Sequence, residues 1–341
     1  MVNTGFGVFY YAGKAWLTHG NPYSIGGRPT EFVYPPTSLP LFGALALFDF
    51  AFASQLWWIT YLSVFVAALL ILVLTLENGR KYVCIWIAVL LILTSHPLLS
   101  LFYLGQSDLL VASLAFLSLA FEKLKHPWPS AVLLSAATLL TVSPVLLLIY
   151  FVVFRRDLRY LGRYLLSTLA LIGTSLFTVP AGMYWGYLAS VSPALAVSFE
   201  ANWLQSVTEI LVLVCFAVFS YWVGSKNTGA CGALRANAMF LMNVLVILFL
   251  TSAFAIYSYV WAILPLALFL SFLMMEKTRK EWLLTTGLAA CLLNSPLSAN
   301  FLHCPIQFPL EVLGSFMLTL ILIPISVRPT IVLRPAISNS A

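Results

Sequence analysis

The chain has very few charged residues. Only 8% of its 341 residues are Asp, Glu, Lys or Arg, whereas 62% are hydrophobic, and the mean hydropathy is +0.99. A soluble domain carries roughly 25% charged residues, so too few polar side chains are present for a surface that faces water. Because a spanning helix needs about 20 apolar residues, the sequence predicts an all-α, polytopic transmembrane helical bundle with about 10 to 11 membrane segments.

The apolar runs are continuous and are separated by short polar stretches. Several of them are short for a complete crossing. The run 128–153 has basic residues on both flanks and Pro144 at its centre, where proline removes a backbone donor and breaks a helix. We therefore expect two half-helices that meet near Pro144. The predicted segments are 36–49, 55–76, 82–98, 107–122, 128–153, 164–182, 207–224, 237–253, 257–275, 282–296 and 309–327.

The sequence also lacks the patterns of metal and nucleotide sites. Its five cysteines are scattered, with no CxxC or Cys/His spacing. No GxGxxG motif follows a strand, so no nucleotide-sugar domain is expected. The N-terminus lacks the basic-then-apolar order of a cleavable signal peptide. We expect neither a cofactor nor a metal.

The net charge of +6 comes from 17 Lys and Arg residues that lie in short clusters between apolar runs. This distribution is typical of cytoplasmic loops in membrane proteins, and it argues against a nucleic-acid partner. The predicted cytoplasmic clusters are Arg80-Lys81, Lys123 with Lys125, Arg155 to Arg163, Lys226 with Arg235, Lys277 to Lys280, and Arg328 with Arg334.

The segments between helices on the opposite side hold almost no Lys or Arg. They are rich in aromatic residues, which are common at membrane interfaces and which also form sugar-stacking surfaces. Both interpretations stay open. These segments are 1–35, about 96–106, 183–206, 254–258 and 297–308.

Residues 1–35 are predicted to be an extracytoplasmic loop with an amphipathic helix in the membrane interface. Phe6, Phe9, Tyr10 and Trp16 fall near one helical stripe, and Gly20-Asn21-Pro22 should end the helix. Residues 36–327 would then form the transmembrane domain, and 328–341 a cytoplasmic tail.

Several motifs together resemble glycosyltransferase family 87, the polyprenol-phosphate-mannose-dependent mannosyltransferases of the GT-C class. The likeness covers most of the chain, although it lacks the first transmembrane helix of that family. The motifs, in order, are Phe6 with Tyr10-Tyr11-Ala12, Gly20-Asn21-Pro22-Tyr23, Phe32-Val33-Tyr34-Pro35-Pro36, Gly105-Gln106-Ser107-Asp108-Leu109-Leu110, Pro144 followed by Arg155-Arg156, Asn202 to Ser206, and Tyr257 to Pro265.

The resemblance implies an integral membrane enzyme of a bacterial or archaeal plasma membrane. Its donor would be a polyprenyl-phosphate sugar, with mannose transferred to a lipid or glycan acceptor on the non-cytoplasmic face and with inversion. Such a reaction needs a carboxylate base at the acceptor hydroxyl and donors or cations at the leaving phosphate.

Three positions depart from the family pattern. Members usually carry Asp where this chain has Gly5, often Lys at the position of Thr141, and often an acidic residue at that of Ser258. These departures leave a second hypothesis open, a non-catalytic or truncated relative that binds lipid or glycan. A transporter is a third, although no inverted pair of broken segments is seen.

Two other carboxylates could serve as the base. Asp108 lies at the outer end of a helix, where a carboxylate near the membrane suggests function; the alternative is a helix cap, which Ser107-Asp108 also suits. Glu31 precedes Tyr34 by three residues in the first loop; the alternative is a solvated charge.

The remaining candidates would bind substrate. His96 and His303 could hydrogen-bond a sugar or phosphate, although a structural hydrogen bond is the commoner role of such residues. Arg28 suits a bidentate phosphate contact; the alternative is a surface charge. The full set of candidate substrate-binding residues is Tyr10, Tyr11, Arg28, Tyr34, His96, Gln106, Gln205 and His303.

Overall fold

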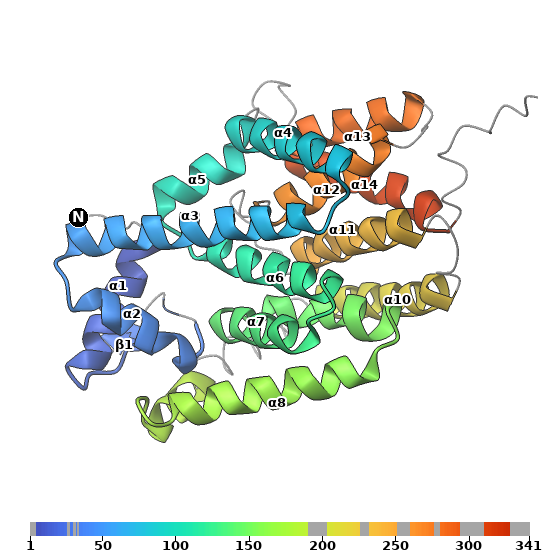
Figure 1. Cartoon of the computed structure of the whole chain (residues 1–341). Coiled ribbons are helices and arrows are strands. Elements are labelled where there is room, and N and C mark those ends of the chain that lie inside the picture. Colours follow the sequence, from blue (N-terminus) through green and yellow to red (C-terminus); the bar gives the residue numbers. More distant parts are fainter. Residues whose placement is uncertain are drawn as a thin grey trace, which may run out of the picture. The chain divides into compact units, whose positions relative to one another are not determined.

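The fold is that of a helical protein (Figure 1). The computed structural model of the chain describes residues 5–25, 28–29, 32, 34–189, 203–225, 232–250, 260–275, 280–293 and 310–327. The sheet found within these ranges is an antiparallel pair of two-residue strands, β1 (Ser24–Ile25) and β2 (Arg28–Pro29). The predicted all-α class is confirmed for these residues.

The chain divides into two compact units. The first comprises Met1–Leu72, Leu101–Val145 and Asp157–Phe216, and the second Val73–Ser100, Leu146–Arg156 and Ala217–Ala341. Each unit has its own buried core of apolar side chains.

The first unit begins with α1 (Gly5–Leu17), which packs against α2 (Leu39–Ala46). The predicted stripe is confirmed, because Phe6, Phe9 and Tyr10 are buried. A Cβ added at Gly13 would overlap the carbonyl group of Phe42, so glycine permits the close helix approach. The apolar stripe therefore faces protein, and the interfacial location of the helix stays a prediction.

The end of α1 differs from the prediction. His19, and not Gly20, adopts the left-handed conformation, with φ of 58°. Its N–H donates to the carbonyl of Trp16 (3.1 Å), and the N–H of Gly20 donates to that of Ala15 (2.7 Å). This pair of bonds is a Schellman motif. The prediction placed the cap one residue late because glycine was assumed to take the left-handed position.

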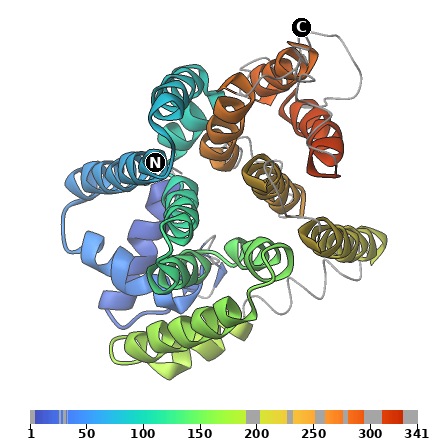
Figure 2. The same ribbon diagram turned by 45° about the vertical axis from the view of Figure 1, so that its right-hand side comes forward.

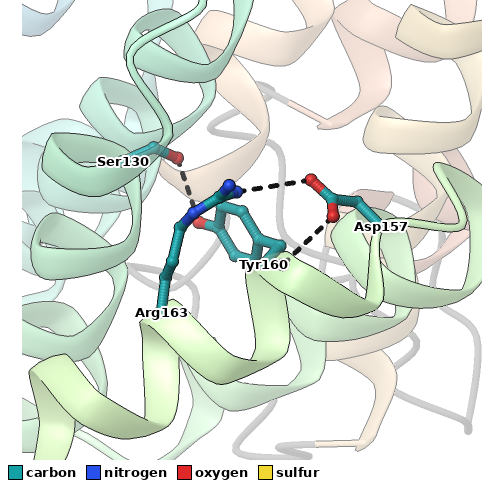
Figure 3. A network of polar contacts seen from close by, with 4 residues as sticks. All are labelled: Ser130, Asp157, Tyr160 and Arg163. Atoms are coloured by element: carbon teal, nitrogen blue, oxygen red, sulfur yellow. Dashed lines mark hydrogen bonds and ion pairs between the residues drawn. The ribbon is translucent and has the colours of Figure 1, made fainter.

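Three helices, α6 (Asp108–Lys123), α7 (Pro127–Leu140) and α8 (Leu158–Ser175), pack in sequence order in the first unit (Figure 2). Their buried contact holds a triangle of hydroxyl groups from Ser118, Ser130 and Tyr160, with oxygens 3.0–3.1 Å apart. Beside it, Asp157 caps α8 through the Tyr160 N–H (3.2 Å) and pairs with Arg163 (3.6 Å) (Figure 3).

The predicted break near Pro144 is confirmed. Helix α7 ends at Leu140, and Thr141 is extended (φ −143°, ψ 145°). The chain continues as the 3-10 helix η2 (Ser143–Leu147) and the π-helix η3 (Ile149–Phe154). Because Pro144 cannot donate to the carbonyl of Leu140 and its ring would clash there, the α-helix stops at that residue.

One helix was missed, because residues 96–106 were expected to connect two spans. The structure has α5 (His96–Leu104) after α4 (Asn78–Thr94). The Ser95 hydroxyl accepts from the Leu98 N–H (3.1 Å), and Pro97 lies in the first turn. Both are standard helix-start signals. Segment 36–49 is likewise shorter than expected, with the 3-10 helix η1 (Pro36–Ser38) before α2.

The second unit packs α4 against α12 (Ile263–Met275), and α13 (Lys280–Leu293) against α14 (Leu310–Val327). Helix α11 (Gly232–Leu250) contacts both α12 and α14. The buried Arg235 donates through Nε to the carbonyl of Ser326 (2.9 Å). A cation is favourable there, at the C-terminal end of α14.

Two helices in the described ranges are long and apolar enough to cross a membrane. They are α3 (Phe50–Leu74), with mean hydropathy 2.4, and the part Val207–Ser225, with mean hydropathy 2.0, of α10 (Trp203–Ser225). The apolar stretches found in other helices are shorter, with 10–17 residues. The helical class thus stands, whereas a bundle of 10 to 11 membrane segments stays a prediction.

Candidate functional site

Two motifs distant in sequence meet in the first unit. The Ser107 hydroxyl donates to the Tyr34 hydroxyl (3.4 Å), which joins the first-loop motif to the turn before α6. The indole N–H of the buried Trp57 donates to the carbonyl of Gly105 (3.2 Å). These bonds fix the turn Gly105–Asp108 between α3 and the first loop.

Gly105 also touches the start of α1. Its φ is 69°, in the left-handed region. A Cβ added there would lie 2.9 Å from the Cβ of Phe6 and 3.3 Å from its backbone nitrogen. The Gly5-Phe6 peptide is therefore packed against the turn that leads into Asp108. Glycine is required at position 105 for its backbone conformation and for this contact.

A cluster of aromatic rings supports the turn. The ring of Phe9 contacts that of Tyr34 edge-on (centroids 4.9 Å apart) and stacks on Phe42 (4.7 Å). Phe42 in turn contacts Trp57 (5.7 Å). Such ring pairs stabilise beyond simple burial, so the cluster holds Tyr34 and the indole that binds Gly105 in fixed positions.

Asp108 is the first residue of α6 and is half-buried. The preceding Ser107 occupies the N-cap position, but its side chain makes no cap hydrogen bond. Its hydroxyl turns to Tyr34 instead. The positive end of a helix dipole is a favourable place for a carboxylate. The turn thus holds the Asp108 carboxylate and, one residue earlier, the Ser107 hydroxyl that contacts Tyr34.

The predicted site residues are partly brought together. Tyr34 and the half-buried Gln106 lie with Asp108 at this turn. Tyr10 is buried, and its hydroxyl donates to the carbonyl of Phe48 (2.9 Å). Tyr11 is 54% exposed and contacts Tyr10 edge-on.

Of the other candidates, His96 is the one whose side chain the structure describes. His96 begins α5 and belongs to the second unit. Glu31 and His303 lie outside the described residues, and Arg28 and Gln205 are described only by their backbones, in β2 and α10. Their roles stay predictions.

A groove of about 370 Å³ lies in the same unit, between α2, α7 and α8. Thr37, three residues after Tyr34, lines it, and its hydroxyl donates to the carbonyl of Leu139 near the end of α7 (2.7 Å). Three residues span at most about 11 Å, so the backbone of Tyr34 lies within that distance of the backbone of Thr37. Lining side chains include those of Thr37, Leu139, Leu140, Thr174, Ser175 and Thr178.

Sequence reasoning missed these hydroxyls. Thr174 and Ser175 end α8, and Thr178 follows in the turn after it; this clustering of hydroxyl residues in an apolar segment was a usable signal. The nearby Thr141 hydroxyl is buried and has no hydrogen-bond partner among the described residues. The groove is therefore lined by both hydroxyl-bearing and leucine side chains.

Aromatic residues predicted for the outer side lie close to this region. The Ser175 and Tyr184 hydroxyls are 2.5 Å apart. The rings of Tyr187 and Tyr23 are 5.6 Å apart, and the Tyr23 hydroxyl donates to the carbonyl of Tyr34 (3.0 Å). Burial raises the pKa of Tyr23, which keeps this phenol protonated as a donor.

The polar contacts described for this region involve hydroxyls, an indole N–H and backbone carbonyls. In the ranges that the structure describes, no three His, Cys, Asp or Glu side chains lie together as metal ligands. The expectation that no metal is used stays a prediction.

Comparison with known proteins identifies one family. The model of glycosyltransferase family 87 matches residues 32–296, which include Tyr34, the Gly105–Asp108 turn, the Pro144 break and the groove. No curated protein and no solved structure matches the chain. The family is one of membrane-associated glycosyltransferases. Because the match extends over well more than half of the chain, the protein belongs to glycosyltransferase family 87.

Proposed function

We propose that the protein is a multi-pass membrane glycosyltransferase of the GT-C class that uses Asp108 as its base. The donor is a polyprenyl-phosphate hexose, with mannose as the sugar, and the acceptor is a hydroxyl of a lipid or glycan on the non-cytoplasmic face. The reaction uses no cofactor. Family membership supports the transferase activity, and the resemblance of the motifs supports the donor class and a bacterial or archaeal plasma membrane.

One observation carries the choice of Asp108. Family members usually have Asp at the position of Gly5, and the Gly5-Phe6 peptide packs against Gly105. Gly105 opens the turn that ends in Asp108. Asp108 follows Gly105 by three residues, which span at most about 11 Å, so its backbone lies within that distance of the residue that contacts the Gly5-Phe6 peptide. This proximity supports a shift of the base from the start of α1 to the start of α6.

The proposed step is a direct displacement. The Asp108 carboxylate accepts the proton of the acceptor hydroxyl as its oxygen bonds to the anomeric carbon. The bond between that carbon and the phosphate oxygen breaks on the opposite face, which inverts the configuration. The leaving polyprenyl phosphate keeps the electron pair.

The groove beside Thr37 suits the polar part of a substrate. Its threonine and serine hydroxyls donate to backbone carbonyls, and their oxygens can accept from sugar hydroxyls. The leucines of α7 add an apolar surface to the groove. The exposed Trp185, in the helix 181–189, and the neighbouring Tyr184 supply ring faces of the kind that stack on sugars. These features support a sugar site at this groove.

Membranes that contain the purified full-length protein and radiolabelled polyprenyl-phosphate mannose would test the proposal. We expect transfer to a lipid or glycan acceptor, and Asp108→Asn to lower the rate by roughly 10²- to 10⁴-fold, the usual contribution of a general base. Asp49→Asn is the matched control. Asp49 accepts from the N–H groups of Ala51 and Phe52 at the start of α3, and Asn caps a helix as well as Asp.

A second function is favoured by Gly5 and Thr141, the described positions where family side chains are replaced. A non-catalytic relative would bind polyprenyl-phosphate sugar and transfer nothing. Retained binding of the labelled donor by a well-folded preparation, without product, would establish that function and reject the enzyme.

A further inference from the structure

The second unit contains an apolar groove of about 580 Å³ between α4, α12 and α13. Its volume lies within the roughly 300–1,000 Å³ of small-molecule sites. Aliphatic side chains from all three helices line it, among them Ile87, Leu90, Leu270, Met274 and Leu283. The residues that line this groove belong to the second unit, whereas the residues proposed for catalysis belong to the first.

The groove offers almost no hydrogen-bonding group to an occupant. The Thr94 hydroxyl, at one end, already donates to the carbonyl of Leu90 (2.8 Å). The exposed thiol of Cys291 is only a weak donor. A polar ligand would lose its hydration here without compensation, so the lining is suited to a hydrocarbon chain.

The surface around the groove is also apolar. Leu93 on α4 is 77% exposed, and Leu284 and Leu288 on α13 are exposed as well. Contiguous exposed apolar surface marks a site of contact with a membrane or a protein. The groove therefore lies in an exposed apolar surface, which is suited to contact with lipid.

Positive charge lies at the start of α4. The Arg80 guanidinium sits 4.3 Å from the centre of the Phe272 ring, between groove-lining positions of α12, and its side chain lies 3.8 Å from Glu77. Lys81 follows. Ile87 lies seven residues after Arg80, about 10 Å along the helix.

We propose that this groove binds one acyl chain of an anionic phospholipid, with the headgroup at the basic start of α4. The hydrocarbon lining selects the chain, since each buried CH₂ group stabilises the bound lipid. Basic residues beside a membrane attract anionic headgroups. The bound lipid packs between α4, α12 and α13. The proposal does not depend on the transferase activity.

A photoreactive lipid tests this binding. The full-length protein is placed in vesicles of phosphatidylglycerol that contain a small fraction of phosphatidylglycerol with a diazirine in one acyl chain. After illumination, mass spectrometry locates the adducts. We expect them to concentrate on the lining residues of α4, α12 and α13.

A filled groove supplies the key comparison. A Cβ at Gly287 meets no atom within 4 Å, so Gly287→Phe can place its ring in the groove without displacing backbone. We expect groove adducts to fall about tenfold, the effect of losing roughly two buried CH₂ groups. Gly287→Ala, which leaves the space open, and Gly162→Phe, an equally unobstructed position on α8, should keep the original yield. The thermal midpoint of each variant shows that it is folded.

Three results would overturn the proposal. Equal adduct yields from folded Gly287→Phe and Gly162→Phe would show that the chain does not occupy the groove. Displacement of the label by polyprenyl phosphate, but not by unlabelled phosphatidylglycerol, would assign the groove to a prenyl chain. Dimers that dissociate only in Gly287→Phe would assign it to a second copy of the protein.

Discussion

The residues around Asp108 fix the position of the turn that leads into it. Gly105 allows the turn to approach α1, Trp57 holds its carbonyl, and Ser107 directs its hydroxyl to Tyr34. None of these side chains supplies the carboxylate proposed as the base. Each restricts the conformations open to the neighbouring residues. A catalytic group needs such a restriction because it must be held in one orientation.

Gly105 is the most sensitive of these residues. Gly105→Ala places a Cβ in a left-handed conformation and against Phe6. We expect the free energy of unfolding to fall by about 2 kcal/mol or more, since the conformation alone costs about 1–2 kcal/mol. Thermal unfolding in detergent measures it.

Gly162→Ala is the control for that change. Gly162 lies in the interior of α8 with open space around it. Alanine there should stabilise by roughly 0.5–1 kcal/mol. Equal effects of the two substitutions would contradict the role given to Gly105.

At the scale of elements, α6, α7 and α8 are joined by the hydroxyl triangle of Ser118, Ser130 and Tyr160. Further along, the Ser135 hydroxyl donates to the carbonyl of Tyr164 (3.1 Å). Buried hydroxyls that bond between helices specify one register of packing. This layer positions the end of α7, where the groove begins.

Loss of one hydroxyl from the triangle should destabilise the protein more than loss of a buried hydroxyl that bonds within its own helix. Ser118→Ala should lower the free energy of unfolding by about 1–3 kcal/mol, because the buried hydroxyls of Ser130 and Tyr160 lose a partner. Ser113→Ala is matched to it, since Ser113 is also buried on α6 but bonds to the carbonyl of Leu109 in its own helix. We expect that change to cost less. Chemical denaturation of both variants measures the two free energies of unfolding. Equal losses would show that the triangle does not stabilise the packing between the helices.

Local patterns in the sequence predicted some elements well. The stripe of Phe6, Phe9 and Tyr10 and the break at Pro144 follow from spacing and from proline geometry, which are properties of neighbouring residues. Helix α5 was not predicted, although Ser95 and Pro97 signal its start. It is too short to span a membrane, so its residues were assigned to a connecting segment.

The candidate site could be predicted only in part. Tyr34, Gln106 and Asp108 were singled out individually, and their meeting depends on contacts between distant residues. The bond from Thr37 to Leu139 joins residues 102 positions apart. No local pattern reports such a contact, so the groove and its hydroxyls were found only in the folded chain.

At the scale of the whole molecule, composition and family agree on a membrane enzyme. The low charge, the apolar helices α3 and α10 and the family match all point to lipid surroundings. The charge clusters predict that Lys125 faces the cytoplasm and that Tyr11 and Asp108 face the opposite side.

Cysteine labelling tests this topology. In a cysteine-free background, Tyr11→Cys should react with an impermeant maleimide in intact cells, and Lys125→Cys should react only after the membrane is opened. Both side chains are exposed, so access depends on the side of the membrane. Labelling of Lys125→Cys in intact cells would reverse the proposed orientation and remove the site from the non-cytoplasmic face.

The central claim is that Asp108 takes the place of the carboxylate missing at Gly5. It is tested most directly by the rate of mannose transfer from polyprenyl-phosphate mannose in three proteins: the unaltered chain, Asp108→Asn, and Asp108→Asn combined with Gly5→Asp. The account predicts a loss of roughly 10²- to 10⁴-fold in the single variant and a partial recovery in the double variant. An unchanged rate in Asp108→Asn would contradict it.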